Sequence, residues 1–326
     1  MRFLVYGAGN IGSLYAARLA KSSQDVAILA RGTRLEQIRQ QGIELEDGIS
    51  GNRTTTSPEV VARLDPDDAY DVVLVILPKH RIAEVLPVLA ANDRTPSVMF
   101  FGNNAAGPGA MADAIGRDRV LLGFPGAAAV PRGGTIRYVI TSAREQPTTV
   151  GELDGSKSAR IVAIASALRA AGFPVSVCTN MDAWLKTHVA EILPTVCALY
   201  RAGGEPEQLA SSDEALRSML RSIREGYQVL RANGVPITPG NHRVFEWLPE
   251  SLLLFLMRRM VKAETAAIKL GHAEQGRVEW QLLANEFRLL IERVDVPTPS
   301  IDVAYRSLSL ASGARGAHAP AGVGPR

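Results

Sequence analysis

The stretch that decides the fold is MRFLVYGAGNIG, residues 1–12. Its apolar run ends at Tyr6 and predicts a buried first strand. Three glycines follow in GxGxxG spacing, which permits a tight turn, close approach of the backbone to a pyrophosphate, and close packing of a helix on the strand. Apolar residues then recur with helical period over residues 10–21, so a helix N-terminus points at the phosphates. The residues predicted to bind a dinucleotide here are Gly7, Ala8, Gly9, Asn10, Ile11 and Gly12.

The end of the second predicted strand, residues 25–29, indicates which dinucleotide is bound. An NAD-binding domain places a carboxylate about 20 residues past the glycines, where it accepts hydrogen bonds from the ribose hydroxyls. This chain has Arg31 there, with Arg34 one helical turn further on. A guanidinium can bind a 2′-phosphate bidentately. We therefore predict NADP(H) as the cofactor, against the alternative that Arg31 is an ordinary surface arginine.

Composition excludes several classes of protein. A formal net charge of +3 over 326 residues is too small to predict a nucleic-acid partner. Cys178 and Cys197 lack metal-ligand spacing, so we predict no metal site and interpret both as buried thiols in a reducing compartment. The apolar stretch at residues 251–257 is too short to span a bilayer. We expect a cytoplasmic protein without a membrane segment.

The sequence pattern changes near residue 180 and divides the chain into two parts. Strand and helix alternate in the first part, which predicts an α/β domain over residues 1–180 with a doubly wound parallel sheet of the Rossmann type. Segments at 138–142 and 148–153 are predicted as later strands, interpreted as antiparallel additions at the sheet edge. Helical periodicity dominates afterwards and predicts an all-helical domain over 181–310. Residues 311–326, rich in Gly, Ala and Pro, are predicted to be a disordered tail.

Ligands of open α/β sheets bind beyond the carboxyl ends of the strands. Lys79 and Asn103 fall in loops at such ends and are predicted to contact the cofactor. The alternatives are a solvated loop lysine and a turn that uses the tolerance of asparagine for left-handed backbone.

Lys186 lies two turns inside a helix that Thr179 and Asp182 are predicted to open as a capping box. A carbonyl reductase needs a group that stabilises and protonates the forming alkoxide, and an ammonium does both. From spacing alone, a surface ion pair between Asp182 and Lys186 is the stronger interpretation. Glu279 borders an apolar helical stripe, where a carboxylate is either paired with a cation or functional.

These residues together resemble the ketopantoate reductase (2-dehydropantoate 2-reductase) family over residues 1 to about 308. The motifs are GAGNIG with Arg31, FFGNNAAG, AWLKTH and the late VEW…VPTPSIDVAY segment. The resemblance implies a Rossmann domain joined to a helical domain, an active site in the cleft between them, and NADPH-dependent reduction of a 2-oxo acid in pantothenate biosynthesis. By position, the family's catalytic lysine falls on Lys186, its active-site acid on Glu279, and its bridging asparagine on Asn103. Arg31 matches the 2′-phosphate arginine, whereas Pro78 shifts Lys79 one place from the family lysine.

Three departures concern the substrate. The resemblance implies asparagines one and two turns after the lysine and a serine before the glutamate, but this chain has Ala190, Pro194 and Ala267. Each lost buried donor costs about 1–3 kcal/mol of recognition. The polar residues available to replace them are Thr187, His188, Glu191 and Thr195, although helix phase places His188 well away from Lys186.

We therefore expect a reductase of a small-molecule carbonyl compound, a 2-oxo acid of the ketopantoate type, with Lys186 as general acid. The alternatives are an oxidoreductase acting on a less polar carbonyl substrate and a non-catalytic NADPH-binding sensor. A homodimer through the helical domain is one option that the sequence leaves open.

Overall fold

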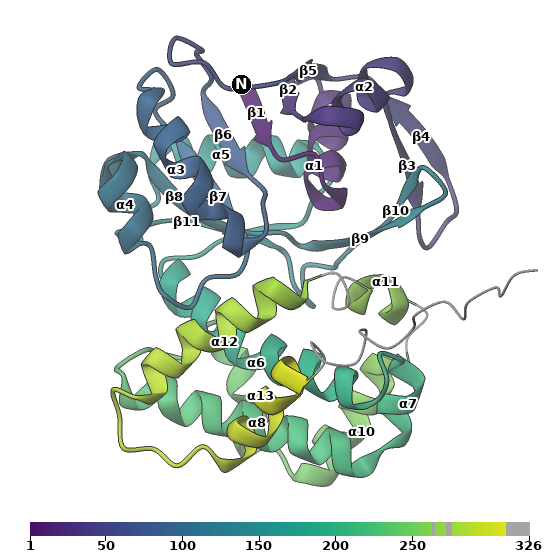
Figure 1. Ribbon diagram of the computed structural model, residues 1–326, viewed down its shortest axis with the longest axis vertical. Coiled ribbons are helices and arrows are strands. Elements are labelled where there is room, and N and C mark those ends of the chain that lie inside the picture. Colours follow the sequence, from purple (N-terminus) through teal and green to yellow (C-terminus); the bar gives the residue numbers. More distant parts are fainter. Residues whose placement is uncertain (263–264, 272–275, 311–326) are drawn as a thin grey trace, which may run out of the picture.

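A computed structural model describes residues 1–262, 265–271 and 276–310 of the chain. The tail predicted at 311–326 lies outside the described residues. Figure 1 shows two parts, an N-terminal part built on sheets and a helical part beneath it. The last strand ends at Val177, and the first helix of the second part begins at Met181.

The main sheet has eight strands in the order β12-β11-β8-β7-β6-β1-β2-β5. Six of them, from β8 to β5 along this order, are mutually parallel, whereas β11 runs antiparallel to β8 and carries β12 parallel beside it. The doubly wound parallel sheet is thus confirmed, as is an antiparallel addition at residues 148–152. The strands span Arg2–Tyr6 (β1), Asp25–Leu29 (β2), Glu59–Val61 (β5), Val72–Val75 (β6), Val98–Phe101 (β7), Val120–Phe124 (β8), Thr148–Glu152 (β11) and Val175–Val177 (β12).

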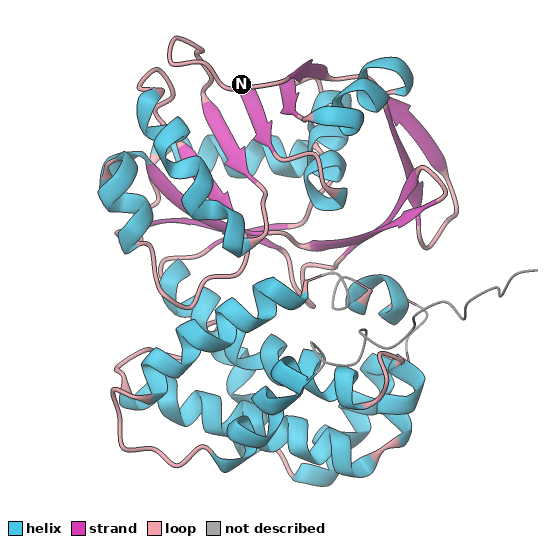
Figure 2. Ribbon diagram, in the orientation of Figure 1, coloured by secondary structure: helices cyan, strands magenta, loops and turns pink. Residues whose placement is uncertain are grey.

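Helices cover both faces of this sheet, and alternation along the strands explains how (Figure 2). In β1, Phe3 and Val5 point to the face covered by α1 (Asn10–Lys21) and α5 (Ala159–Ala170). Leu4 and Tyr6 point to the opposite face, covered by α3 (Ile82–Ala91), α4 (Gly109–Ile115) and the start of α6 (Met181–Arg201). Full burial of such a side chain contributes about 1.5–3 kcal/mol. The carboxyl ends of the strands are therefore held rigidly beside α6.

A second, four-stranded sheet corrects one prediction. Residues 138–142 were expected at the edge of the main sheet, but β10 (Thr135–Ile140) pairs with β9 (Ala127–Arg132) and β3 (Ile43–Asp47), and β3 pairs with β4 (Arg53–Thr56). The physical reason is that this second sheet covers the side of α1 that faces away from the main sheet. Ile136 and Tyr138 bury their side chains in the same core as that helix, which therefore lies between the two sheets.

The helical part follows β12, and within the described ranges it contains helices and no strand. They are α6, α7 (Pro206–Ser211), α8 (Asp213–Ala232), η3 (Gly240–Arg243), α9 (Val244–Trp247), α10 (Glu250–Val261), α11 (Ala266–Leu270), α12 (Arg277–Ile291) and α13 (Pro299–Leu310). None of the helices described is long and apolar enough to cross a membrane.

The start of α6 also corrects a prediction. The predicted capping box gave Thr179 as the cap, but Asn180 caps the helix, with its side chain accepting a hydrogen bond from the Ala183 amide at 3.0 Å. Asp182 is not part of a capping pair because its carboxylate binds Lys186 instead.

Candidate active site

The turn after β1 has the form that a dinucleotide requires. Gly7 has φ +126°, and a methyl group there would lie 2.3 Å from the Ile76 carbonyl oxygen. A methyl group at Gly12 would lie 1.9 Å from the Gly7 carbonyl oxygen, so these two glycines are needed for close packing of strand and helix. A methyl group at Gly9 would meet nothing within 4 Å. The N-terminus of α1 thus opens onto a free cradle that fits a pyrophosphate.

Two arginines flank this cradle. Arg31 is exposed and donates a hydrogen bond to the Tyr6 hydroxyl at 3.2 Å. Arg34 binds the turn itself, with Nε 3.3 Å from the Ala8 carbonyl oxygen and Nη2 3.0 Å from the Ser13 hydroxyl. Arg31 therefore has a guanidinium that a ligand can reach, whereas Arg34 shapes the turn.

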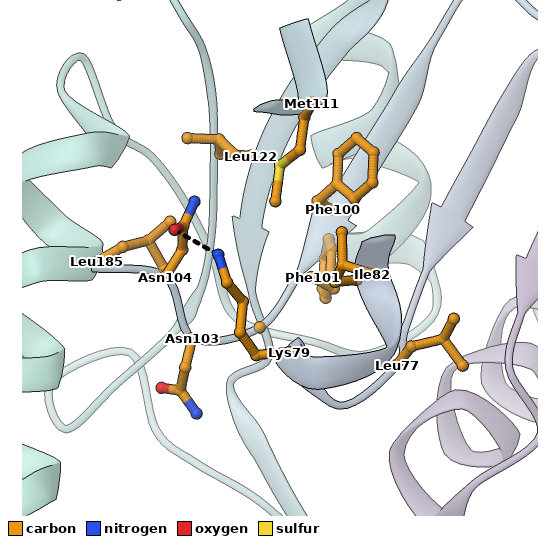
Figure 3. Close-up of a pocket in the computed structure, with 11 residues that line it drawn as sticks. Leu77, Lys79, Ile82, Phe100, Phe101, Asn103, Asn104, Met111, Leu122 and Leu185 are labelled. Atoms are coloured by element: carbon orange, nitrogen blue, oxygen red, sulfur yellow. Dashed lines mark hydrogen bonds between the residues drawn. The ribbon is translucent and has the colours of Figure 1, made fainter. Parts of the chain in front are cut away.

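A loop after β7 forms the centre of the site (Figure 3), and we call residues 102–107 the asparagine loop. Asn104 closes this loop on itself, because its Oδ1 accepts the Gly107 amide at 3.1 Å and its Nδ2 donates to the Gly107 carbonyl oxygen at 2.9 Å. Lys79, from the short helix η1 (Lys79–Arg81), donates to the same Asn104 Oδ1 at 2.7 Å. Sequence reasoning singled out Asn103 of this asparagine pair and missed Asn104.

Glu286 of α12 joins this network from the helical part. Its Oε1 lies 3.3 Å from Lys79 Nζ, and both side chains are only about one-tenth exposed, at 11% and 10%. Its Oε2 accepts the backbone amides of Ala105 and Ala106, each at 3.1 Å. One carboxylate therefore holds a lysine and two loop amides of the other domain. This role of Glu286 was not predicted from the sequence, in which its position on the apolar stripe of α12 is its only signal.

Glu279 lies two turns earlier on α12, and its carboxylate contacts the Asn103 side chain. Asn103 Nδ2 lies 3.5 Å from Glu279 Oε1, and the Lys79 backbone amide also donates to this carboxylate. Burial raises the pKa of Glu279 above its usual range, although both hydrogen bonds and the nearby charges of His80 and Lys79 oppose the shift. Asn103 Oδ1 is buried and has no partner among the described residues, so it is an acceptor that a ligand can use.

Lys186 lies on the other side of the asparagine loop. Its Nζ is 2.5 Å from Asp182 Oδ2, so the expected ion pair exists, but the lysine side chain is only 13% exposed. A methyl group at Gly107 would lie 3.8 Å from Lys186 Nζ and 3.2 Å from Asp182 Oδ1. The lysine end of the pair is therefore largely buried, whereas the Asp182 side chain is 37% exposed, and the lysine faces the loop that carries Asn103 and Asn104.

Of the four polar residues expected to replace the missing substrate ligands, two have local partners. The Thr187 hydroxyl accepts the Thr238 amide at 3.1 Å. The Thr195 hydroxyl donates to the Glu191 carbonyl oxygen of its own helix at 2.8 Å. Both hydroxyls are therefore engaged in hydrogen bonds within the helical part.

The other two are held by aromatic and ionic contacts. His188 stacks on Trp184 at 5.5 Å between ring centroids and lies 4.3 Å from the ring of Phe124. The Glu191 carboxylate binds the Tyr227 hydroxyl and His242 Nδ1, the latter at 2.6 Å. All four side chains thus have partners within the protein.

The packing around position 190 explains why this chain has no amide side chain there. Ala190 is 2% exposed, and a methyl group at Gly226 of α8 would lie 3.1 Å from its Cβ. Position 190 therefore faces the crossing of α6 and α8. Pro194 is also buried, whereas Ala267 lies exposed on α11.

The fold and the site define a two-domain nucleotide-binding protein with a lysine and a carboxylate at the carboxyl edge of its parallel sheet. Residues 3–155 match the family model described as ketopantoate reductase PanE/ApbA. A 2-dehydropantoate 2-reductase of Mesorhizobium japonicum is 26% identical, covering 93% of this chain and 95% of that protein. An uncharacterized oxidoreductase of Bacillus subtilis, YkpB, is 25% identical over 73% and 78% of the two chains.

Solved structures share the complete two-domain fold. A putative ketopantoate reductase from Ralstonia solanacearum superposes with a TM-score of 0.77 at 20% identity, covering 97% of this chain and 98% of that one. D-Mandelate dehydrogenase, in a ternary structure with NADH and anilino(oxo)acetate, gives 0.75 at 14% identity over 95% and 97%. The match over residues 3–155 is to the ketopantoate reductase family, as the motifs predict, and the whole chain is similar to proteins named for that activity.

Proposed function

We propose that the protein is an NADPH-dependent reductase of 2-oxo acids, with Lys186 as the general acid. The observation that carries this proposal is the position of the Lys186 ammonium. It is largely buried, and it faces the asparagine loop at the edge of the sheet on which the dinucleotide turn also opens. A substrate carbonyl beside this loop would lie within reach of a proton donor.

The chemistry follows from the charges around the carbonyl. Reduced nicotinamide, when bound, supplies a hydride to the carbonyl carbon. The Lys186 ammonium stabilises the negative charge that develops on the carbonyl oxygen and donates the proton that completes the hydroxyl group. Asp182 keeps the ammonium in place through its 2.5 Å contact. Asn103, with its unpartnered Oδ1 and its contact to Glu279, would hold a second polar group of the ligand.

Arg31 supports NADPH over NADH. It stands where NAD-binding domains have an acid, and its guanidinium is exposed beside the turn. Replacement of Arg31 by alanine is expected to raise KM for NADPH by about tenfold or more, since a bidentate phosphate contact is lost, and to leave KM for NADH nearly unchanged. Equal effects on both cofactors would overturn the assignment of NADPH.

Two observations favour a substrate less polar than ketopantoate. Position 190 packs against Gly226, and the four expected polar substitutes have other partners. The relative from Mesorhizobium japonicum is named for reduction of 2-dehydropantoate, whereas the structural neighbour D-mandelate dehydrogenase is named for an aromatic 2-hydroxy acid. We therefore propose a 2-oxo acid with an apolar side chain as the second candidate substrate.

The test is oxidation of NADPH with a panel of carbonyl compounds that includes ketopantoate, phenylglyoxylate and simple ketones. Lys186→Ala is expected to lower kcat by about 10²- to 10⁴-fold, the usual loss of a general acid. Lys157→Ala, at an exposed position, is the matched control and should retain full activity. Turnover of ketopantoate at ordinary enzyme rates would overturn the apolar substrate class. NADPH binding without turnover of any carbonyl would favour the sensor alternative.

A further inference from the structure

The asparagine loop belongs to the N-terminal part of the chain but is embedded in the helical part. The Ala105 side chain is fully buried, and it lies in the same hydrophobic core as Val189 of α6 and Phe287 of α12. The loop contacts α12 through the Ala105 and Ala106 amides and faces α6 at Gly107. It therefore lies between two helices of the other domain, and the groups that hold it there set its distance from each helix.

On the side of α12, one carboxylate holds the loop in two ways. Glu286 Oε2 accepts the Ala105 and Ala106 amides directly, each at 3.1 Å. Glu286 Oε1 lies 3.3 Å from Lys79 Nζ, which donates to Asn104 Oδ1 at 2.7 Å. Figure 3 shows the Lys79 side chain directed toward Asn104. The carboxylate thus fixes the loop both through its backbone and through the lysine.

On the side of α6, the loop packs directly against the pair of Asp182 and Lys186. Gly107 has φ +85°, and a methyl group there would lie 3.2 Å from Asp182 Oδ1 and 3.8 Å from Lys186 Nζ. No side chain separates the loop backbone from this ion pair at Gly107. A displacement of the loop relative to α12 therefore changes its distance from the Lys186 ammonium directly.

We propose that Glu286 is a positioning residue of the reductase. Its carboxylate holds the asparagine loop at the distance from Lys186 that hydride transfer requires. This inference rests on the proposed function, in which Lys186 is the general acid. A misplacement of about 1 Å can cost about 10²-fold in rate, so loss of the carboxylate should act on kcat.

The affinity for NADPH should change little when Glu286 is replaced. The hydrogen-bonding and ionic partners of Glu286 among the described residues are Lys79, Ala105 and Ala106. None of these residues belongs to the dinucleotide turn at residues 7–12, and Arg31 is not among them. A separation of kcat from NADPH affinity is therefore the signature of this role.

The first test compares three variants on α12 with the best substrate of the carbonyl panel. Glu286→Ala is expected to lower kcat by about 10- to 100-fold. Glu286→Gln should lower kcat less, because its amide oxygen can still accept both loop amides. Glu292→Gln, at the exposed end of the same helix, is the matched control and should retain full activity. Binding of NADPH, followed by nicotinamide fluorescence, should be nearly equal in all three.

A primary deuterium isotope effect separates positioning from loss of folded protein. A smaller folded fraction lowers the measured rate without changing the isotope effect on kcat. A misplaced loop slows the hydride-transfer step itself, so the isotope effect with NADPH deuterated at the transferred position should rise in Glu286→Ala. An isotope effect equal to that of the wild type, with a lowered kcat, would overturn the positioning role.

A double-mutant cycle tests whether Lys79 and Glu286 act as one pair. Lys79→Met and Glu286→Gln each leave one buried charge without its opposite partner. The double variant removes both charges, so its loss of kcat should be smaller than the product of the two single losses. A loss equal to that product would show independent action and would overturn the pairing.

Failure of this inference and failure of the proposed function give different results. An active wild-type protein with unchanged kcat in Glu286→Ala would overturn the positioning role alone. A large loss of NADPH affinity in Glu286→Gln and Lys79→Met, with kcat unchanged, would assign the pair to cofactor binding and also overturn it. A wild-type protein that turns over no carbonyl compound would overturn the proposed function, and this inference with it.

Discussion

Replacement of Glu286 tests whether one carboxylate of the helical domain holds the asparagine loop in place. In Glu286→Ala, the amide of fully buried Ala105 loses its acceptor, whereas the amide of exposed Ala106 can bind water. An unsatisfied buried amide costs about 1–3 kcal/mol. Lys79 loses its ion pair but keeps Asn104 as an acceptor, so we add about 1–2 kcal/mol for this contact. The expected loss of unfolding free energy is about 2–5 kcal/mol in total.

Glu286→Gln separates the two contributions. Its amide oxygen can still accept both loop amides, so only the charge beside Lys79 is lost, with an expected cost of about 1–2 kcal/mol. Glu292→Gln, at the exposed end of the same helix, is the matched control and should stay within about 0.5 kcal/mol of wild type. Urea unfolding followed by both tryptophan fluorescence and circular dichroism gives these values where the two transitions coincide.

Hydrogen exchange gives a second readout that is local to the loop. The Ala105 amide should exchange faster in Glu286→Ala than in Glu286→Gln, because the glutamine still accepts its hydrogen bond. Equal stability of Glu286→Ala and Glu292→Gln would refute the reasoning. Equal effects of alanine and glutamine at position 286 would show that the charge beside Lys79, and not the loop amides, carries the contribution.

Three further predictions concern packing and pH. Ala190→Asn should lose about 1–3 kcal/mol of stability from overpacking against Gly226 and gain no turnover of ketopantoate, and a variant with wild-type thermal stability would contradict this. Burial raises the pKa of Glu279, so the native state binds more protons, and wild-type stability falls as pH rises from about 4 through the raised pKa. Relative to wild type, Glu279→Gln should therefore gain unfolding free energy over this range, and a difference that is constant with pH would refute the prediction. Burial alone would lower the pKa of His242, but the hydrogen bond and charge of Glu191 outweigh it and raise the pKa. This stabilisation should be present below about pH 6.5 and lost as pH rises through the raised pKa, and Glu191→Gln should flatten that slope in urea titrations.

The local sequence pattern predicted the helix and strand bounds of the dinucleotide-binding half closely. The helix at residues 10–21 and the strand at 25–29 have the predicted bounds, because apolar periodicity and the glycines determine them locally. The second sheet escaped prediction for a physical reason. The AAAVPR segment of β9 carries a weak strand signal, and it is a strand because it pairs with β10 and covers α1.

The site was predictable where a residue's role follows from its position in a motif. The structure brings Lys79, Asn103, Lys186 and Glu279 around one loop. Their roles in binding and catalysis stay predictions. Glu286 was recognisable only as part of an apolar helical stripe, because its partners Ala105 and Ala106 lie about 180 residues earlier in the chain. A contact over such a separation depends on the docking of two domains, which no local pattern encodes.

The substrate side of the site depends on helix packing as much as on the loss of polar residues. Ala190 and Gly226 are both small, and their contact sets how closely α6 and α8 cross. Because no residue is smaller than glycine, α8 cannot make room for a larger side chain at position 190 without moving along the whole crossing. A shift of that kind would also displace Tyr227, which neighbours Gly226 and binds Glu191 of α6. The apolar character proposed for the substrate is therefore tied to the core of the helical domain, and a single substitution that adds an amide to α6 should fail to restore ketopantoate as a substrate.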